Sequence, residues 1–226
     1  MKPKKRRPGR PSVEERDSDA IQRDILVAAR SEFVEHGLDG ARVDRIAERA
    51  GVNKRLLYHY VGNKETLYSH VLLQAYRDIR AGEEELCLAS LPPVEAMSRL
   101  VAFTFDHFHE NPWFIRLLST ENIQRARYVR EIPELQSLHS PIIGEIARIL
   151  KEGLEQGVFH RDVDPVQLYI TMAGMSYFYF SNIHTLAVVF GKPLATDEAM
   201  AERRAHAVEV MIAYLRAERD LPENNH

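Results

Sequence analysis

The chain has 226 residues, 45% of them apolar, which is enough for one or two domains with a buried core. It contains neither a continuous apolar run long enough to span a membrane nor the apolar core of a secretory signal, so we expect a cytoplasmic protein without membrane contacts. The single cysteine, Cys87, has no partner for an internal disulfide and is interpreted as a reduced structural thiol.

Positive charge is concentrated at the N-terminal end. Residues 1–60 carry 14 Lys and Arg against 10 Asp and Glu, whereas residues 61–226 carry 16 against 23. The segment MKPKKRRPGRP has enough proline and glycine to prevent a helix. We interpret residues 1–18 as a flexible basic arm, which either solubilises the protein or binds DNA phosphates and a minor groove. In the second case the DNA contacts would be Lys4, Lys5, Arg6, Arg7 and Arg10.

Helical periodicity begins at Asp19. Apolar residues recur every three or four positions as far as Gly37, which supplies a C-terminal stop. The segment RVDRIAERAGV then predicts a second, two-turn helix that ends at Gly51.

A third short helix follows a tight turn. Asn53 caps the segment KRLLYHYV, in which Leu57 and Val61 face inward, and Asn63 caps the helix after it. Two short helices joined by a glycine-containing turn form a helix-turn-helix. We therefore expect residues 19–64 to be a DNA-binding domain.

The third helix would enter the major groove of DNA. Its cations can reach guanine edges or phosphates, its tyrosines and histidine can hold phosphate oxygens, and its first leucine can touch a thymine methyl. The alternative is a short solvated helix whose tyrosines pack on the first helix. The predicted contacts are Lys54, Arg55, Leu56, Tyr58, His59 and Tyr60.

The order of residues from Ile25 to Tyr68 resembles the DNA-binding head of the TetR (tetracycline repressor) family. This resemblance implies that Lys54 to Tyr60 form the recognition helix and that Lys64 binds phosphate at the start of the next helix. Arg42 replaces the Thr or Ser that usually opens the second helix, and we expect it to contact phosphate. The resemblance also implies a homodimer that binds a palindromic double-stranded DNA operator.

The predicted body, residues 65–219, is followed by a tail at 220–226, and no alternating strand pattern is present, so the fold class is all-α. The apolar segment 168–182 is too short to span a membrane and is predicted to lie between subunits, with the last helix, in a four-helix dimer interface. Helices are expected at 64–81, 94–109, 113–124, 141–157, from Asp164 and Pro165 onward, and from an Asp197 cap to Arg216.

A pocket for a small-molecule effector is expected in the body, although each of its residues could equally be plain core. The segments ENPWFIRLLSTENIQ and DPVQLYITMAGMSYFYFSNIHTL resemble the C-terminal domain of regulators of nicotinate and related ring-compound catabolism. This resemblance implies an aromatic or heteroaromatic acid as effector, with Arg116 as the carboxylate partner. The predicted pocket residues are Phe105, His109, Trp113, Arg116, Leu117, Glu121, Asn122, Met172, Met175 and Tyr179.

Signatures of catalysis are missing from the sequence. It has no nucleophile elbow, phosphate-binding loop, zinc-binding HExxH or dinucleotide-binding glycine motif, so we expect neither an enzyme nor a cofactor. His107 and His109 lie on different helix faces without a third ligand, so no metal site is predicted. The favoured interpretation is a repressor released from its operator by an effector. The alternatives are an activator of the same fold and a nonspecific architectural DNA-binding protein.

Overall fold

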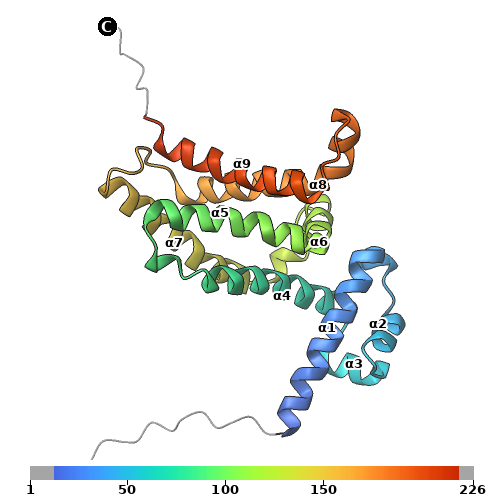
Figure 1. The fold of residues 1–226 in the computed structure, drawn as a ribbon. Coiled ribbons are helices and arrows are strands. Elements are labelled where there is room, and N and C mark those ends of the chain that lie inside the picture. Colours follow the sequence, from blue (N-terminus) through green and yellow to red (C-terminus); the bar gives the residue numbers. More distant parts are fainter. Residues whose placement is uncertain (1–12, 219–226) are drawn as a thin grey trace, which may run out of the picture. The chain divides into compact units, whose positions relative to one another are not determined.

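A computed structural model of the protein describes residues 13–218, with side chains from residue 18 onward. In this part of the chain every regular element is helical, which confirms the all-α prediction (Figure 1). The α-helices are α1 (Val13–Gly40), α2 (Val43–Arg49), α3 (Lys54–Val61), α4 (Lys64–Glu85), α5 (Pro93–Glu110), α6 (Pro112–Ile123), α7 (Glu134–Glu155), α8 (Pro165–Phe190) and α9 (Asp197–Arg216), with short 3-10 helices η1 (Leu88–Ser90) and η2 (Val129–Glu131).

The chain forms two compact units that meet inside α4, between Leu72 and Leu73. We call residues 13–72 the head and residues 73–218 the body. In the head, α1 packs against α2 and α2 against α3. Phe33 of α1 and Tyr68 of α4 meet edge to face in its core, with ring centroids 5.1 Å apart.

The first helix is longer than the periodicity predicts. It begins at Val13 rather than Asp19, because no proline or glycine interrupts this stretch and a helix can start on polar residues. At the other end, Gly37 leaves the helical conformation, with φ 66° and ψ 176°, as its predicted role of C-terminal stop requires. One further turn then ends at Gly40.

Three predicted N-caps are confirmed. The Oδ1 atoms of Asn53, Asn63 and Asp164 each accept a hydrogen bond from the backbone N–H three residues later, at 2.8, 2.7 and 2.8 Å. The predicted cap of the last helix is wrong by one residue. Thr196 caps α9 through its Oγ1, and Asp197 is the first helical residue, where its charge suits the helix N-terminus.

The predicted start of α7 at Pro141 is also wrong, because the helix begins at Glu134 and passes through the proline. Proline removes one helical hydrogen bond and disfavours the helical conformation of the preceding residue, which is why the sequence indicates a break. The helix continues because Leu135, Ile142 and Ile146 lie on one face and are all buried. Their packing offsets the lost bond.

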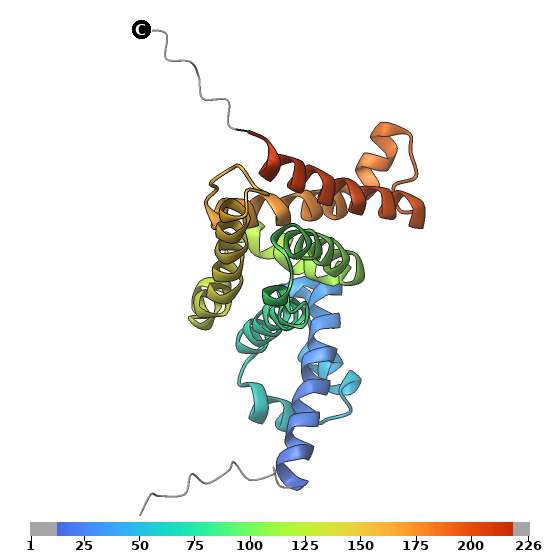
Figure 2. The same cartoon turned by 60° about the vertical axis from the view of Figure 1, so that its left-hand side comes forward.

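The body packs around α5, which contacts α7, α8 and α9 (Figures 1 and 2). Its main core combines residues from these four helices with η1 and the segment after α7: Leu88, Ala96, Met97, Leu100, Val101, Ile142, Ile146, Ile149, Leu150, Phe159, Leu168, Met172, Ala207, Met211 and Leu215. A smaller cluster contains Phe105, Tyr179 and Ile183. None of the helices between residues 13 and 218 is long and apolar enough to cross a membrane.

Candidate nucleic-acid interface and effector site

The helix α3 has one buried side and one exposed side. Leu57 and Val61 point into the head and are only 1% and 4% exposed, as predicted. The remaining side chains are available to a ligand of the head. Of the six predicted DNA contacts on α3, Lys54, Arg55, Tyr58 and His59 are exposed, whereas Leu56 and Tyr60 are half-buried.

Three of these side chains, Lys54, His59 and Tyr60, have partners within the head. The Lys54 ammonium forms an ion pair with the Asp44 carboxylate of α2, and both groups are more than half exposed. His59 and Tyr60 lie edge to face with ring centroids 5.5 Å apart. Because the Lys54 pair is solvated, it costs little to exchange Asp44 for a phosphate.

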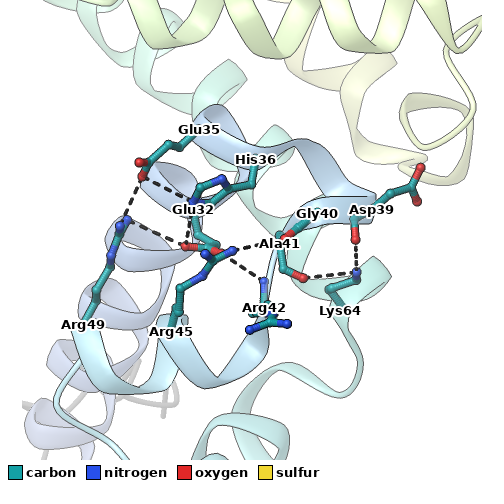
Figure 3. A network of polar contacts seen from close by, with 10 residues as sticks. All are labelled: Glu32, Glu35, His36, Asp39, Gly40, Ala41, Arg42, Arg45, Arg49 and Lys64. Carbon is teal, nitrogen blue, oxygen red and sulfur yellow. Dashed lines mark hydrogen bonds and ion pairs between the residues drawn. The ribbon is translucent and has the colours of Figure 1, made fainter.

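A buried carboxylate joins α1 to the start of α2 (Figure 3). Glu32 is 0% exposed, and its Oε1 accepts hydrogen bonds from the backbone N–H of Arg42 at 3.0 Å and from Nε of Arg45 at 2.7 Å. Arg42 is the N-cap residue of α2, and its side chain makes no capping bond. Glu32 therefore binds the backbone N–H of the N-cap residue, the donor that a Glu or Gln binds in a capping box, and the cap that a Thr or Ser hydroxyl would make to later N–H groups is missing.

A second arginine of α2 extends this network. Nη2 of Arg49 donates to the Glu35 carboxylate at 3.1 Å, and its Nη1 lies 3.9 Å from Oε2 of Glu32 (Figure 3). The hydrogen bond from Arg49 lowers the pKa of Glu35, with the charge of His36 as the next cause. The two arginines of α2 thus bind α1, and the guanidinium of Arg42 stays exposed.

Lys64 contacts the segment between α1 and α2. Its Nζ donates to the carbonyl oxygens of Asp39 and Ala41, at 3.5 and 3.3 Å (Figure 3). The side chain is half-buried at the first residue of α4. Its role as a phosphate contact stays a prediction, as does that of Arg42. The predicted arm contacts Lys4, Lys5, Arg6, Arg7 and Arg10 lie outside the described residues.

The ten predicted effector contacts stay a prediction, and the structure places them in different surroundings. Phe105 and Tyr179 lie together, with ring centroids 6.0 Å apart, and Met172 belongs to the main core instead. The buried carboxylate of Glu121 accepts the backbone N–H groups of Tyr128 and Val129, each at 3.2 Å, and so holds the turn after α6. Leu117 is also buried, Trp113 and Met175 are half-buried, and His109, Arg116 and Asn122 are exposed.

The body contains a cavity of about 370 Å³ between the end of α4, η1 and α7. It is lined by Arg80, Glu83, Glu84, Cys87, Leu88, Ala89, Ser137, Leu138, Pro141, Ile142 and Glu145. Arg80 and Glu83 are 5% and 6% exposed, and Nη2 of Arg80 lies 2.8 Å from Oε1 of Glu83. None of these lining residues belongs to the predicted effector set.

Large exposed apolar side chains gather on α8 and α9. Val166, Ile170 and Phe178 repeat at intervals of four to eight residues along α8, which places them on one face. Val188, Val189 and Phe190 continue the exposed apolar surface to the end of α8, and α9 adds Val210 and Tyr214. We call these eight residues the α8/α9 face. An exposed apolar surface of this kind indicates an interaction site.

Two family profiles match the chain. Residues 25–71 match the bacterial regulatory proteins of the tetR family, and residues 93–211 match the tetracyclin repressor-like C-terminal domain. The chain belongs to the TetR family. It is a DNA-binding transcriptional regulator, and the family resemblance of its sequence is confirmed.

Named regulators resemble most of the chain. It is 33% identical over 190 residues to the transcriptional repressor NicS of Pseudomonas putida. The matched residues make up 84% of this chain and 90% of NicS. It is 30% identical over 163 residues to the transcriptional repressor SCO4008 of Streptomyces coelicolor, covering 71% of this chain and 79% of that protein.

Solved TetR-like structures share the fold. The transcriptional regulator SCO4942 of Streptomyces coelicolor superposes with a TM-score of 0.63 at 26% identity, covering 84% of this chain and 96% of that one. The ketosteroid transcriptional regulator KstR2 of Mycobacterium tuberculosis gives a TM-score of 0.62 at 18% identity, covering 87% and 95% of the two chains.

Sequence reasoning missed Glu32, Arg80 and Glu83. The sequence nevertheless contains a signal for each of them. Glu32 falls on the apolar stripe of α1, and Arg80 and Glu83 fall on that of α4 after Ile79. A charged residue on a buried helix face must be paired or neutralised, so such a position predicts an internal ion pair or a binding site.

Proposed function

We propose that this TetR-family protein is a homodimeric repressor that acts in the cytoplasm, binds a palindromic operator, and leaves it when a small-molecule effector binds the body. The exposed side of α3 carries this proposal, since it presents two cations and two ring side chains on a helix whose opposite side is fixed in the head. The names of NicS and SCO4008 as repressors support the sign of regulation.

The role proposed for the head rests on how α2 and α3 are held. Glu32 fixes the start of α2 against α1, and the Asn53 cap fixes the start of α3. A preorganised recognition helix loses less conformational entropy on binding DNA than a mobile one would. Arg55 is proposed to contact base edges, and Lys54, Lys64 and Arg42 to contact phosphates.

Dimerisation is proposed to occur through the α8/α9 face. Burying such side chains gains roughly 25 cal/mol for each Å² of apolar surface removed from water. Two copies related by a two-fold axis would pair α8 and α9 with their counterparts in a four-helix interface. The same axis would place two recognition helices about one helical turn of DNA apart, so the operator is proposed to be palindromic.

The effector is proposed to act by shifting a conformational equilibrium. In one of the two conformational states, the heads are wrongly spaced for adjacent major grooves. A ligand that binds this state more tightly lowers the affinity for the operator, by an amount set by the difference between its affinities for the two states. An aromatic or heteroaromatic acid is the proposed class of effector.

The test is selection of operators from random DNA with the purified full-length protein at about physiological salt. Enrichment of a palindrome with fixed half-site spacing is expected. Enrichment of single half-sites would contradict the dimer, and the absence of any motif would contradict sequence-specific binding. A reporter under the selected operator then tests the sign of regulation. Its transcription should fall when the protein is supplied, whereas a rise would identify an activator.

A further inference from the structure

The cavity beneath η1 combines an apolar wall with a buried guanidinium. Leu88, Leu138 and Ile142 supply apolar surface, and Arg80 supplies the charge. A volume of about 370 Å³ falls in the range of small-molecule sites, roughly 300 to 1,000 Å³. The residues that line it come from parts of α4, η1 and α7 that lie within the body.

Arg80 has more hydrogen-bond donors than partners. Its Nη2 donates to the Tyr169 hydroxyl of α8 at 3.0 Å and pairs with Oε1 of Glu83 at 2.8 Å. Its Nε and Nη1 are buried without a hydrogen-bond partner among the described residues. Leaving buried donors of a charged group unsatisfied is costly, and a ligand that supplied acceptors would remove this cost.

Glu83 does not fully neutralise Arg80 at neutral pH. Loss of solvation raises the pKa of Glu83 to about 8, although the positive charge of Arg80 acts in the opposite direction. At pH 7 the Glu83 carboxyl is therefore mostly protonated and can donate a hydrogen bond. The guanidinium beside it is then buried without an ionised carboxylate from Glu83, and its Cζ lies 5.5 Å from the centroid of the Tyr169 ring.

The other titratable groups near this pair leave that charge in place. Burial lowers the pKa values of His107 on α5 and His139 on α7, so both rings are neutral, and burial raises the pKa of Tyr169 on α8. Glu145 of α7 is hydrogen-bonded by Arg148, at distances from 2.5 to 3.2 Å. Glu84 and Asp78 of α4 are exposed, and Gln74 donates to the Asp78 carboxylate at 2.7 Å. Glu121 of α6 accepts the backbone N–H groups of Tyr128 and Val129.

We propose that this cavity binds a small organic acid whose single carboxylate accepts hydrogen bonds from the unused donors of Arg80 and from the Glu83 carboxyl. The apolar body of the acid packs against Leu88 and Ile142. The carboxylates of Glu84 and Glu145 on the cavity wall disfavour a second negative charge, so a monocarboxylate fits better than a phosphate or a dicarboxylate. This site deepens the proposed function, on which its role as the effector site rests, and it replaces Arg116 as the carboxylate partner.

Binding of the acid depends on pH in a defined direction. The acid binds the state in which Glu83 is protonated, and ionised Glu83 competes for Arg80 as the pH rises. The dissociation constant should therefore be nearly constant between pH 6 and pH 7, where the acid is ionised, and increase about tenfold between pH 7 and pH 9. Replacing Glu83 by Gln keeps a hydrogen-bond donor without the ionisation, so the Glu83→Gln variant should bind with little dependence on pH.

The test is calorimetry on the full-length protein without DNA, with benzoate and nicotinate as probes and their neutral amides, benzamide and nicotinamide, as matched controls. The acids should bind at least about tenfold more tightly than the amides, and Arg80→Met should remove this preference. Arg99→Met is the control, since Arg99 is exposed and pairs with Glu95 on its own helix. Preferred binding of benzylamine, or no saturable binding of either acid, would overturn the proposal.

Cys87 gives an independent measure of the place of binding. It is the single cysteine of the chain, it is exposed, and it lines the cavity. Bound acid should slow its alkylation by iodoacetamide. Binding without protection of Cys87, or loss of binding in Arg116→Met with retention in Arg80→Met, would place the acid elsewhere. If Arg80→Met does not fold, the pH profile of Glu83→Gln and the alkylation rate still decide the matter.

Operator binding separates this proposal from the proposed function. A protein that selects a palindrome but binds neither acid would contradict the cavity proposal alone. A protein whose acid binding depends on Arg80 but whose operator complex is unaffected by the acid would keep the site and lose the effector role. A protein that binds the acids but selects no DNA motif would contradict the proposed function while keeping the site.

Discussion

The Glu32 carboxylate accepts the backbone N–H of Arg42 at 3.0 Å and so links the buried side of α1 to the first residue of the helix-turn-helix. The same oxygen lies 2.6 Å from Nη2 of Arg45. A single side chain therefore satisfies a helix N-terminus and neutralises an arginine. The Glu32 side chain is 0% exposed, and an unpaired carboxylate at such a buried position would be strongly destabilising.

Glu32→Ala should destabilise the head by about 3 kcal/mol, because it leaves the Arg42 N–H without its acceptor and Arg45 without its carboxylate, with only the Gly40 carbonyl still bound. Urea unfolding of the full-length protein measures the change. The matched control is Glu35→Ala, which removes an exposed partner of Arg49 and should change the stability far less than Glu32→Ala does. Similar losses in the two variants would mean that burial of Glu32 contributes nothing to its role.

Arg55→Ala should weaken binding to the selected operator by ~1 to 3 kcal/mol and leave binding to random DNA nearly unchanged. The reason is that Arg55 is exposed on α3, where a guanidinium can reach a guanine edge. Fluorescence anisotropy with both DNAs at one salt concentration measures the difference. An equal loss on the two DNAs would identify Arg55 as a phosphate contact.

Deleting residues 1–11 should chiefly reduce the salt dependence of operator binding. Each phosphate contact that is lost lowers the slope of log affinity against log salt by about 0.9. Titrations at several salt concentrations measure this slope for the full-length and shortened proteins. An unchanged slope would assign the arm a solubilising role.

Stability should fall with rising pH because of Glu83. Its pKa is about 8 in the folded protein, above the ordinary value of 4.5, so the folded state holds a proton that the unfolded state releases. The corresponding stability is fully present below pH 4.5 and is lost as the pH rises to about 8. Between pH 5 and pH 8 the wild type should lose on the order of 3 kcal/mol more than Glu83→Gln in urea unfolding. Parallel pH profiles of the two proteins would contradict this.

Local signals in the sequence predicted the head better than the body. The caps at Asn53 and Asn63 are local, since a polar side chain bonds a backbone group three residues away, and such signals can be read without tertiary structure. At Pro141 the local signal pointed to a break, and packing of residues distant in the sequence overruled it. The one-residue error at Asp197 has another cause, since Thr and Asp side chains both cap helices well and Thr196 comes directly before it.

The cavity was harder to predict for a physical reason. It joins α4 to α7, and helical spacing shows which residues share a face but not which face of another helix lies opposite. Arg116 was suggested as a carboxylate partner by the family resemblance, and it stays a prediction, with its side chain exposed. The more informative pattern was Arg80 and Glu83 on an otherwise apolar stripe, because burial makes a charged side chain costly to leave unpaired.

Phe178→Asp should convert the protein to a monomer and weaken operator binding together with it. Phe178 is 58% exposed near the middle of α8, and in the proposed interface a carboxylate there would be buried among apolar side chains without a partner. Sedimentation velocity over a range of concentrations measures the oligomeric state. Ile123→Asp is the matched control, since Ile123 is 83% exposed at the end of α6, outside this face, and its replacement should leave the dimer intact. A Phe178→Asp protein that stayed dimeric would exclude the α8/α9 face as the interface. A monomer with full operator affinity would show that operator binding does not require the dimer.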